Sequence, residues 1–201
     1  MAKRRSFNRS TGNRRYKRLF VVATEGQLTE PAYFSLLNDA VVFAHVRLAS
    51  AGNDSAPEHV LRRMEAELAK ASMRDGDEAW LVLDKDSWTH EQLTKVFAWT
   101  QGHSWRGLAL SNPKFEYWLL LHFEDGHGVA SSADCTRRLA RHLPNYDKGI
   151  RPGLLSLEQV RSAVRRAQQR DKPPCADWPR DLGQTTVYRL VDGILNAGGN
   201  E

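Results

Sequence analysis

The 201-residue chain contains only two cysteines, Cys135 and Cys175, which lie far apart without CxxC or Cys/His metal-ligand spacing. The sequence therefore predicts neither a structural zinc site nor a disulfide framework, and a reducing cytoplasm is the expected compartment. No apolar run approaches the roughly 18 residues that a membrane span needs, so we expect no membrane partner. The apolar run after the basic N-terminus, residues 19–23, is too short for a secretory signal.

Three nucleotide- and nucleic-acid-binding signatures are also missing. The sequence has no GxxxxGK[ST] phosphate-binding loop, so any ATP hydrolysis is expected to come from another polypeptide. It shows no helix-turn-helix and no RNA-binding signature, which leaves open whether a nucleic-acid target would be DNA or RNA.

Acidic residues are absent from residues 1–18, where basic residues are abundant. This segment carries +8 and the whole chain +5, so the remaining residues carry −3. We expect residues 1–18 to form a flexible basic tail, because a block of like charge with little apolar content does not pack. Two interpretations stay open: an arm that holds nucleic-acid phosphates, with Phe7 and Tyr16 stacking on bases, or a solubilising terminus. The candidate phosphate-binding residues are Lys3, Arg4, Arg5, Arg9, Arg14, Arg15, Lys17 and Arg18.

Strand-like and helix-like patterns alternate after the tail, which is typical of a parallel sheet built from βαβ units. The expected strands are residues 19–23, 43–49, 79–84 and 107–112. The expected helices between and after them are residues 29–39, 57–73, 89–101 and 113–123, followed by 131–143, 155–170 and 185–195. We therefore predict an α/β core over residues 19–125, a parallel sheet flanked by helices, and a C-terminal part over 126–201 made of helices only.

Carboxylates follow the expected strands. Glu25 follows the first, Asp84 and Asp86 end the third, and Glu116 lies one turn into the helix after the fourth. Because the carboxyl ends of parallel strands share one edge, these side chains are candidates for a single site. Two carboxylates about 4 Å apart repel by roughly 4 kcal/mol at an effective dielectric near 20. A hard cation such as Mg²⁺ or Mn²⁺ would relieve that repulsion, since it binds oxygen ligands.

Structural interpretations stay open for the same residues. Asp84 and Asp86 could be turn or helix-cap carboxylates, and Glu25 a solvated acid. Glu116 could simply favour the N-terminus of its helix, and Asn112 is expected to cap that helix.

Residues further along the chain have simple structural interpretations too. His122 lies in an apolar run and is expected to be a hydrogen-bonded packing residue. Lys148 could neutralise a scissile phosphate or be a solvated turn lysine. The residues expected in the core of this region are Phe115, Trp118, Leu119 and Leu121.

Glutamate and glycine after the first strand (Glu25, Gly26) and a DxD after a later one (Asp84 to Asp86) resemble the Toprim fold of topoisomerases, primases and certain nucleases. Together with the stretches EGQLTEPAYF (25–34), WLVLDKD (80–86) and SNPKFEYWLLLHF (111–123), they make the chain similar to the RloB family of bacterial proteins, also called the AbiLii type. The resemblance covers residues 19–125, and residues 144–149 and 185–195 show a weaker similarity. The sequence departs from the pattern at Ser87 and Trp88, and at Lys114.

The resemblance implies a Toprim-like, metal-dependent nuclease of antiphage defence or restriction-associated loci, which acts beside a separately encoded ABC/AAA-type ATPase. Asp84 and Asp86 would hold Mg²⁺ or Mn²⁺, Glu25 would complete the metal ligands or act as general base, and Glu116 would be a further acidic ligand. Two alternatives remain: a nucleic-acid-binding subunit without catalysis, and a regulatory protein that docks on the ATPase.

Overall fold

The computed structural model describes residues 16–50, 52, 56–85 and 88–198. Over these ranges the chain forms a five-stranded, mostly parallel sheet with seven helices, which confirms the α/β prediction at that level. The strands are β1 (Arg18–Thr24), β2 (Ala44–Leu48), β3 (Glu78–Asp84), β4 (Arg106–Asn112) and β5 (Gln184–Thr185). Their order is β2-β1-β3-β4-β5, and only β5 runs antiparallel to its neighbour.

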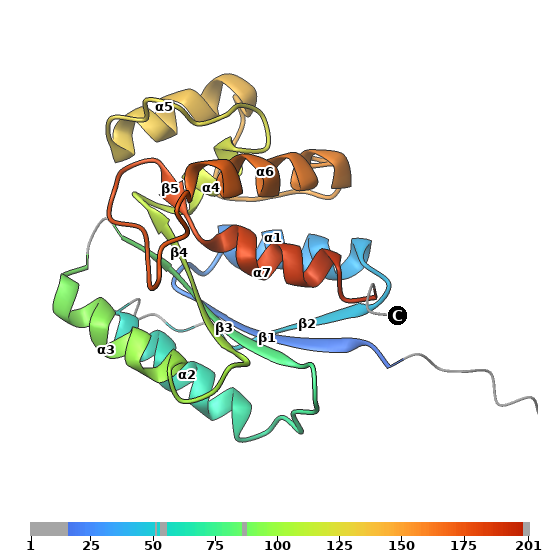
Figure 1. Cartoon of the computed structure of the whole chain (residues 1–201). Coiled ribbons are helices and arrows are strands. Elements are labelled where there is room, and N and C mark those ends of the chain that lie inside the picture. The colour runs from blue at the N-terminus through green and yellow to red at the C-terminus, as the bar shows by residue number, and fades with distance from the viewer. Residues whose placement is uncertain (1–15, 51, 53–55, 86–87, 199–201) are drawn as a thin grey trace, which may run out of the picture.

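The helices form a layer on each face of the sheet. They are α1 (Thr29–Ala40), α2 (Pro57–Leu68), α3 (His90–Thr100), α4 (Phe115–Leu120), α5 (Ser132–His142), α6 (Leu157–Arg170) and α7 (Val187–Leu195). Helices α2 and α3 cover one face, and α1 and α7 cover the other together with α4, α5 and α6 (Figure 1). Within the described ranges no helix is both long and apolar enough to cross a membrane.

The structure of β1 explains why the first apolar run, residues 19–23, does not alternate between apolar and polar residues. Phe20 and Val22 pack in the hydrophobic core on the α1 and α7 face, whereas Val21 and Ala23 pack in the core under α2 and α3. Successive side chains of a strand point to opposite faces, and here both faces are covered by helices. All four side chains are fully buried, so a continuous apolar run is required.

Helix ends differ from the sequence prediction near the site. The sequence predicts a helix over 113–123, whereas α4 begins at Phe115 after an extended Lys114. The prediction that Asn112 caps this helix is wrong, because its side-chain amide instead donates to the Arg180 carbonyl (2.9 Å). Similarly, the helix predicted over 57–73 ends at Leu68.

Residues 171–183, which we call the edge strap, connect α6 to β5 and cross the edge of the sheet. Trp178 of the strap is buried in the core on the α2 and α3 face, although α6 and α7 lie on the opposite face. Its ring packs against those of His90 and Phe97, with centroids 5.4 and 5.5 Å away. The prediction that the chain after residue 126 consists of helices alone therefore missed β5. The C-terminal residues instead add a strand to the sheet and side chains to the helical layers on both of its faces.

Candidate functional site

The chain changes direction across the sheet between β1 and β3. Helix α1, which follows β1, packs on one face, and α2 and α3 pack on the other. In open α/β sheets, ligands bind in the crevice outside the carboxyl ends of the two strands at such a switch point. Glu25 follows β1 and Asp84 ends β3, so the structure places both carboxylates at this crevice.

A cavity of about 530 Å³ opens at this edge, and we call it the acidic cavity. Four carboxyl side chains line it, from the ends of β1 and β3, the first turn of α1 and the first turn of α4: Glu25, Asp84, Glu30 and Glu116. Two lysines, Lys114 and Lys148, line it as well. The structure thus brings together three of the four predicted acidic residues and the predicted Lys148; Asp86 lies outside the described residues.

Glu25 is oriented by two N–H donors from the β3 side of the cavity. Its Oε2 accepts hydrogen bonds from the backbone N–H of Asp84 and from the Trp88 indole, each at 3.0 Å. The Glu25 backbone N–H donates to the Val82 carbonyl (2.9 Å), which extends the β1 and β3 pairing by one residue. The carboxylate is therefore held in one orientation at the strand ends.

Glu30, in the first turn of α1, also belongs to the cavity. It is 6% exposed, and its Oε1 accepts a hydrogen bond from the Gly26 backbone N–H (3.0 Å). A Cβ on residue 26 would lie 2.2 Å from the Glu30 carboxylate, so any other residue there would force that carboxylate to move. Burial raises the pKa of Glu30, and the charges of Glu116 and Glu25 raise it further. The charges of the neighbouring carboxylates thus act unfavourably on an ionised Glu30, and a bound cation would offset them.

The loop that carries Lys148 is tied to the start of α1. The Thr29 hydroxyl donates to the Lys148 carbonyl (2.9 Å) and lies 3.0 Å from the Tyr146 hydroxyl, which also donates to Glu116 Oε1 (3.5 Å). Lys148 itself is exposed and has a positive φ of 53°. These bonds explain how a residue distant in sequence reaches the acidic cavity.

Lys114 is the second cation of the cavity, and it is one of the positions at which the sequence departs from the expected family pattern. Its Nζ donates to the Thr136 hydroxyl of α5 (2.7 Å), which fixes the side chain beside the carboxylates. The sequence could have indicated this role, because Lys114 lies two residues before Glu116.

Other polar residues of β1 and β4 lie outside the acidic cavity. Ser111 and Asn112 are buried and hold β5 and the edge strap, with Ser111 Oγ 2.9 Å from Thr185 Oγ1. Arg18 is the first residue of β1 and bonds to Glu78 and to the Gly76 carbonyl, at the end of the strands opposite the acidic cavity.

Lys17 is exposed next to Arg18. The Tyr16 hydroxyl donates to Asp77 (2.9 Å), at the same end of the sheet. The tail residues Lys3, Arg4, Arg5, Phe7, Arg9, Arg14 and Arg15 lie outside the described residues.

The packing role predicted for His122 is confirmed. The ring is 2% exposed, with Nε2 3.1 Å from the Tyr33 hydroxyl and Nδ1 3.0 Å from the Trp118 carbonyl. The four core predictions are confirmed as well, because these side chains are all 1% exposed or less: Phe115, Trp118, Leu119 and Leu121.

The ligand chemistry of the cavity fits a hard divalent cation. Glu25 and Asp84 offer carboxylate oxygens, and the lining contains neither His nor Cys. Among the described residues no three His, Cys, Asp or Glu side chains form a metal-holding group. Mg²⁺ commonly uses one or two protein carboxylates together with water and substrate phosphate, so two carboxylates suffice for a site completed by substrate.

No curated protein and no solved structure matches the chain. One protein-family model does match, over residues 20–194, and its description is RloB-like protein. The match begins inside β1 and ends inside α7, so it includes every element that lines the acidic cavity. Because it covers most of the sequence, the chain belongs to the RloB-like family.

Proposed function

We propose that the chain is a metal-dependent endonuclease that hydrolyses phosphodiester bonds of DNA or RNA. The observation that carries the proposal is the acidic cavity, where carboxylates from separate strand ends face two lysines at the switch point of the sheet. Carboxylates bind divalent cations and lysines bind phosphate oxygens, so the cavity contains groups for both the metal and the phosphate of a metal–phosphate complex.

Each residue has a chemical role in this proposal. Asp84 and Glu25 would hold the cation, with Asp86 as the second carboxylate of the DxD and Glu116 as a further acidic ligand. A bound Mg²⁺ or Mn²⁺ would stabilise the charge that develops on the phosphate. Glu25, oriented by its N–H donors, would complete the metal ligands or accept the proton of the attacking water. Lys148, with Lys114, would hold the phosphate.

The proposal extends to the biological setting that the family resemblance implies. The chain would be the effector of an antiphage defence system and would act with a separately encoded ABC/AAA-type ATPase. The Toprim assignment belongs to this proposal, and the EG and DKD motifs at the ends of β1 and β3 support it.

The decisive experiment compares Asp84→Asn with Asp181→Asn, an exposed aspartate of the edge strap that serves as the matched control. We expect Asp84→Asn to lower Mg²⁺- or Mn²⁺-dependent cleavage about 100-fold or more, because it removes a metal ligand. Cleavage of DNA and of RNA is measured with the ATPase present, and metal binding by calorimetry. Full cleavage by Asp84→Asn would overturn the proposal.

The hydrogen bonds of Glu25 also accommodate a second function, nucleic-acid binding or partner regulation without catalysis. These bonds give the carboxylate a structural role in joining β1 to β3 even if no metal binds. In that case Glu25→Ala would lower the melting temperature, while Asp84→Asn would leave salt-sensitive nucleic-acid or ATPase binding unchanged and no variant would cleave.

A further inference from the structure

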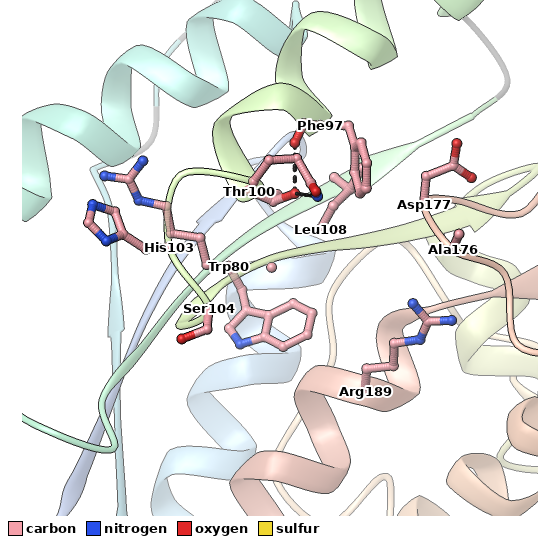
Figure 2. Close-up of a pocket in the computed structure, with 12 residues that line it drawn as sticks. Trp80, Phe97, Thr100, His103, Ser104, Leu108, Ala176, Asp177 and Arg189 are labelled. Atoms are coloured by element: carbon pink, nitrogen blue, oxygen red, sulfur yellow. Dashed lines mark hydrogen bonds between the residues drawn. The ribbon is translucent and has the colours of Figure 1, made fainter.

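A second cavity, of about 470 Å³, lies against the amino-terminal half of β4, and we call it the edge cavity (Figure 2). Its lining comes from β3, β4, α3, the loop between α3 and β4, α7 and the edge strap, and includes none of the residues that line the acidic cavity. It is therefore a separate feature from the site of the proposed nuclease activity.

The backbone of β4 alternates in direction along the strand. The Lys85 N–H donates to the Ser111 carbonyl (2.9 Å), so the odd-numbered residues of β4 face β3. The N–H and C=O groups of Arg106, Leu108 and Leu110 consequently point outward, away from β3. Arg106 and Leu108 line the edge cavity, so its floor is strand backbone.

Most of these outward groups are already paired. Thr186 accepts from the Leu110 N–H (2.9 Å), donates its own N–H to the Leu110 carbonyl (2.9 Å) and donates its hydroxyl to the Leu108 carbonyl (3.3 Å). The Arg106 N–H donates to the His103 carbonyl (3.1 Å). Within the part of the chain that the structure describes, the Arg106 C=O and the adjacent Leu108 N–H have no hydrogen-bond partner.

One free acceptor beside one free donor limits what can bind. A partner strand would need a longer row of unpaired backbone groups along β4. Thr186 already pairs with Leu110 on one side of the free pair, and His103 pairs with the Arg106 N–H on the other. A planar heterocycle with a neighbouring donor and acceptor, such as the hydrogen-bonding edge of a nucleobase, needs only this pair.

The walls of the edge cavity suit a flat ring lying in the plane of the sheet. Figure 2 shows Phe97 and Thr100 on one side of the strands and Trp80 and Arg189 on the other. The Trp80 indole lies against Gly107, where a Cβ would come within 2.4 Å of the ring. Aromatic rings and guanidinium planes are the groups on which nucleobases stack.

Arg189 is held in place on this wall. Its guanidinium donates to Asp171 (2.7 Å) and to the Cys175 carbonyl (2.8 Å), so it forms a fixed cationic plane. From these observations we infer that the edge cavity binds a nucleobase, whose hydrogen-bonding edge pairs with the Arg106 C=O and the Leu108 N–H. The base can come from a free nucleotide or from a single-stranded nucleic acid.

The test is a titration of the full chain, followed through the Leu108 backbone amide by NMR. The probes are AMP, CMP, GMP and UMP, and single-stranded DNA and RNA hexamers of each base. A saturable shift with a mononucleotide identifies a free-nucleotide site; a shift with hexamers alone identifies recognition of a base within a strand. Either result supports the inference, whereas no Leu108 shift with any probe overturns it.

Two controls separate this site from binding elsewhere. Ala176→Trp, at an exposed strap position that lines the cavity, should weaken binding about tenfold or more by blocking the stack; Ala133→Trp, at an exposed position of α5, should not. An edge-blocked base, N6,N6-dimethyl-AMP, should bind correspondingly more weakly than AMP if AMP binds. Equal binding by Ala176→Trp and wild type would overturn the inference.

Discussion

His122 is a buried ring whose protonation would oppose folding. Burial lowers its pKa to about 4, against about 6.5 for an exposed histidine. Between these values the unfolded chain binds a proton that the folded chain does not, so stability must fall as the pH falls from about 6.5 to about 4. The full loss is about 3 kcal/mol.

This pH dependence can be measured by urea unfolding of wild type and His122→Gln at several pH values. We expect the variant to lose less stability than wild type over the same acid range, because glutamine does not titrate. The exposed His45→Gln serves as the control and should keep the wild-type slope. Identical slopes for wild type and His122→Gln would show that another group is responsible.

Among the elements, the edge strap is the one whose removal has the clearest consequence. Trp178 is 2% exposed and packs against α3, so Trp178→Ala should destabilise the fold by about 3–5 kcal/mol through the cavity it leaves. Hydrogen exchange should show faster exchange at the Gly183 N–H, which bonds the Asn112 carbonyl. Trp178→Phe, which keeps an aromatic ring, should lose less stability than Trp178→Ala. Unchanged exchange in Trp178→Ala would mean that β5 holds the strap without the tryptophan.

Elements also differ in how far the sequence predicts them. Four strands and the position of Glu25 follow from local patterns, because apolar runs buried on both faces end where the chain leaves the sheet. Strand β5 has two residues and no pattern of its own; it exists because Thr185 and Thr186 meet β4 in space. Glu30 was missed as a cavity residue for the same reason, since its place depends on Gly26 folding back over it.

On the scale of the whole molecule, the start of β1 and the acidic cavity lie at opposite ends of the sheet. Strand β1 runs from Arg18, beside Glu78, to Thr24, next to Glu25, and its seven residues span roughly 20 Å. The described part of the basic segment, Tyr16 to Arg18, therefore lies at the end of the sheet away from the acidic cavity.

Two deletions test what the basic N-terminal segment contributes to binding and to stability. Removing residues 1–15 should leave the melting temperature unchanged and reduce the salt dependence of duplex DNA binding, by a slope of up to about five, because six basic residues are lost. Removing residues 1–18 should also lower the melting temperature, because the Arg18 and Tyr16 bonds are lost. An unchanged salt slope after the shorter deletion would favour a solubilising terminus over a phosphate-binding arm.

The late position of the edge strap and β5 in the sequence has a consequence for synthesis on the ribosome. Strands β1 to β4 emerge first, but the groups that cover the β4 edge and fill the pocket beside α3 lie after residue 170. An open strand edge invites pairing with other chains, so the nascent protein exposes an aggregation-prone surface until the edge strap and β5 have emerged. Truncated translation products would retain that surface permanently.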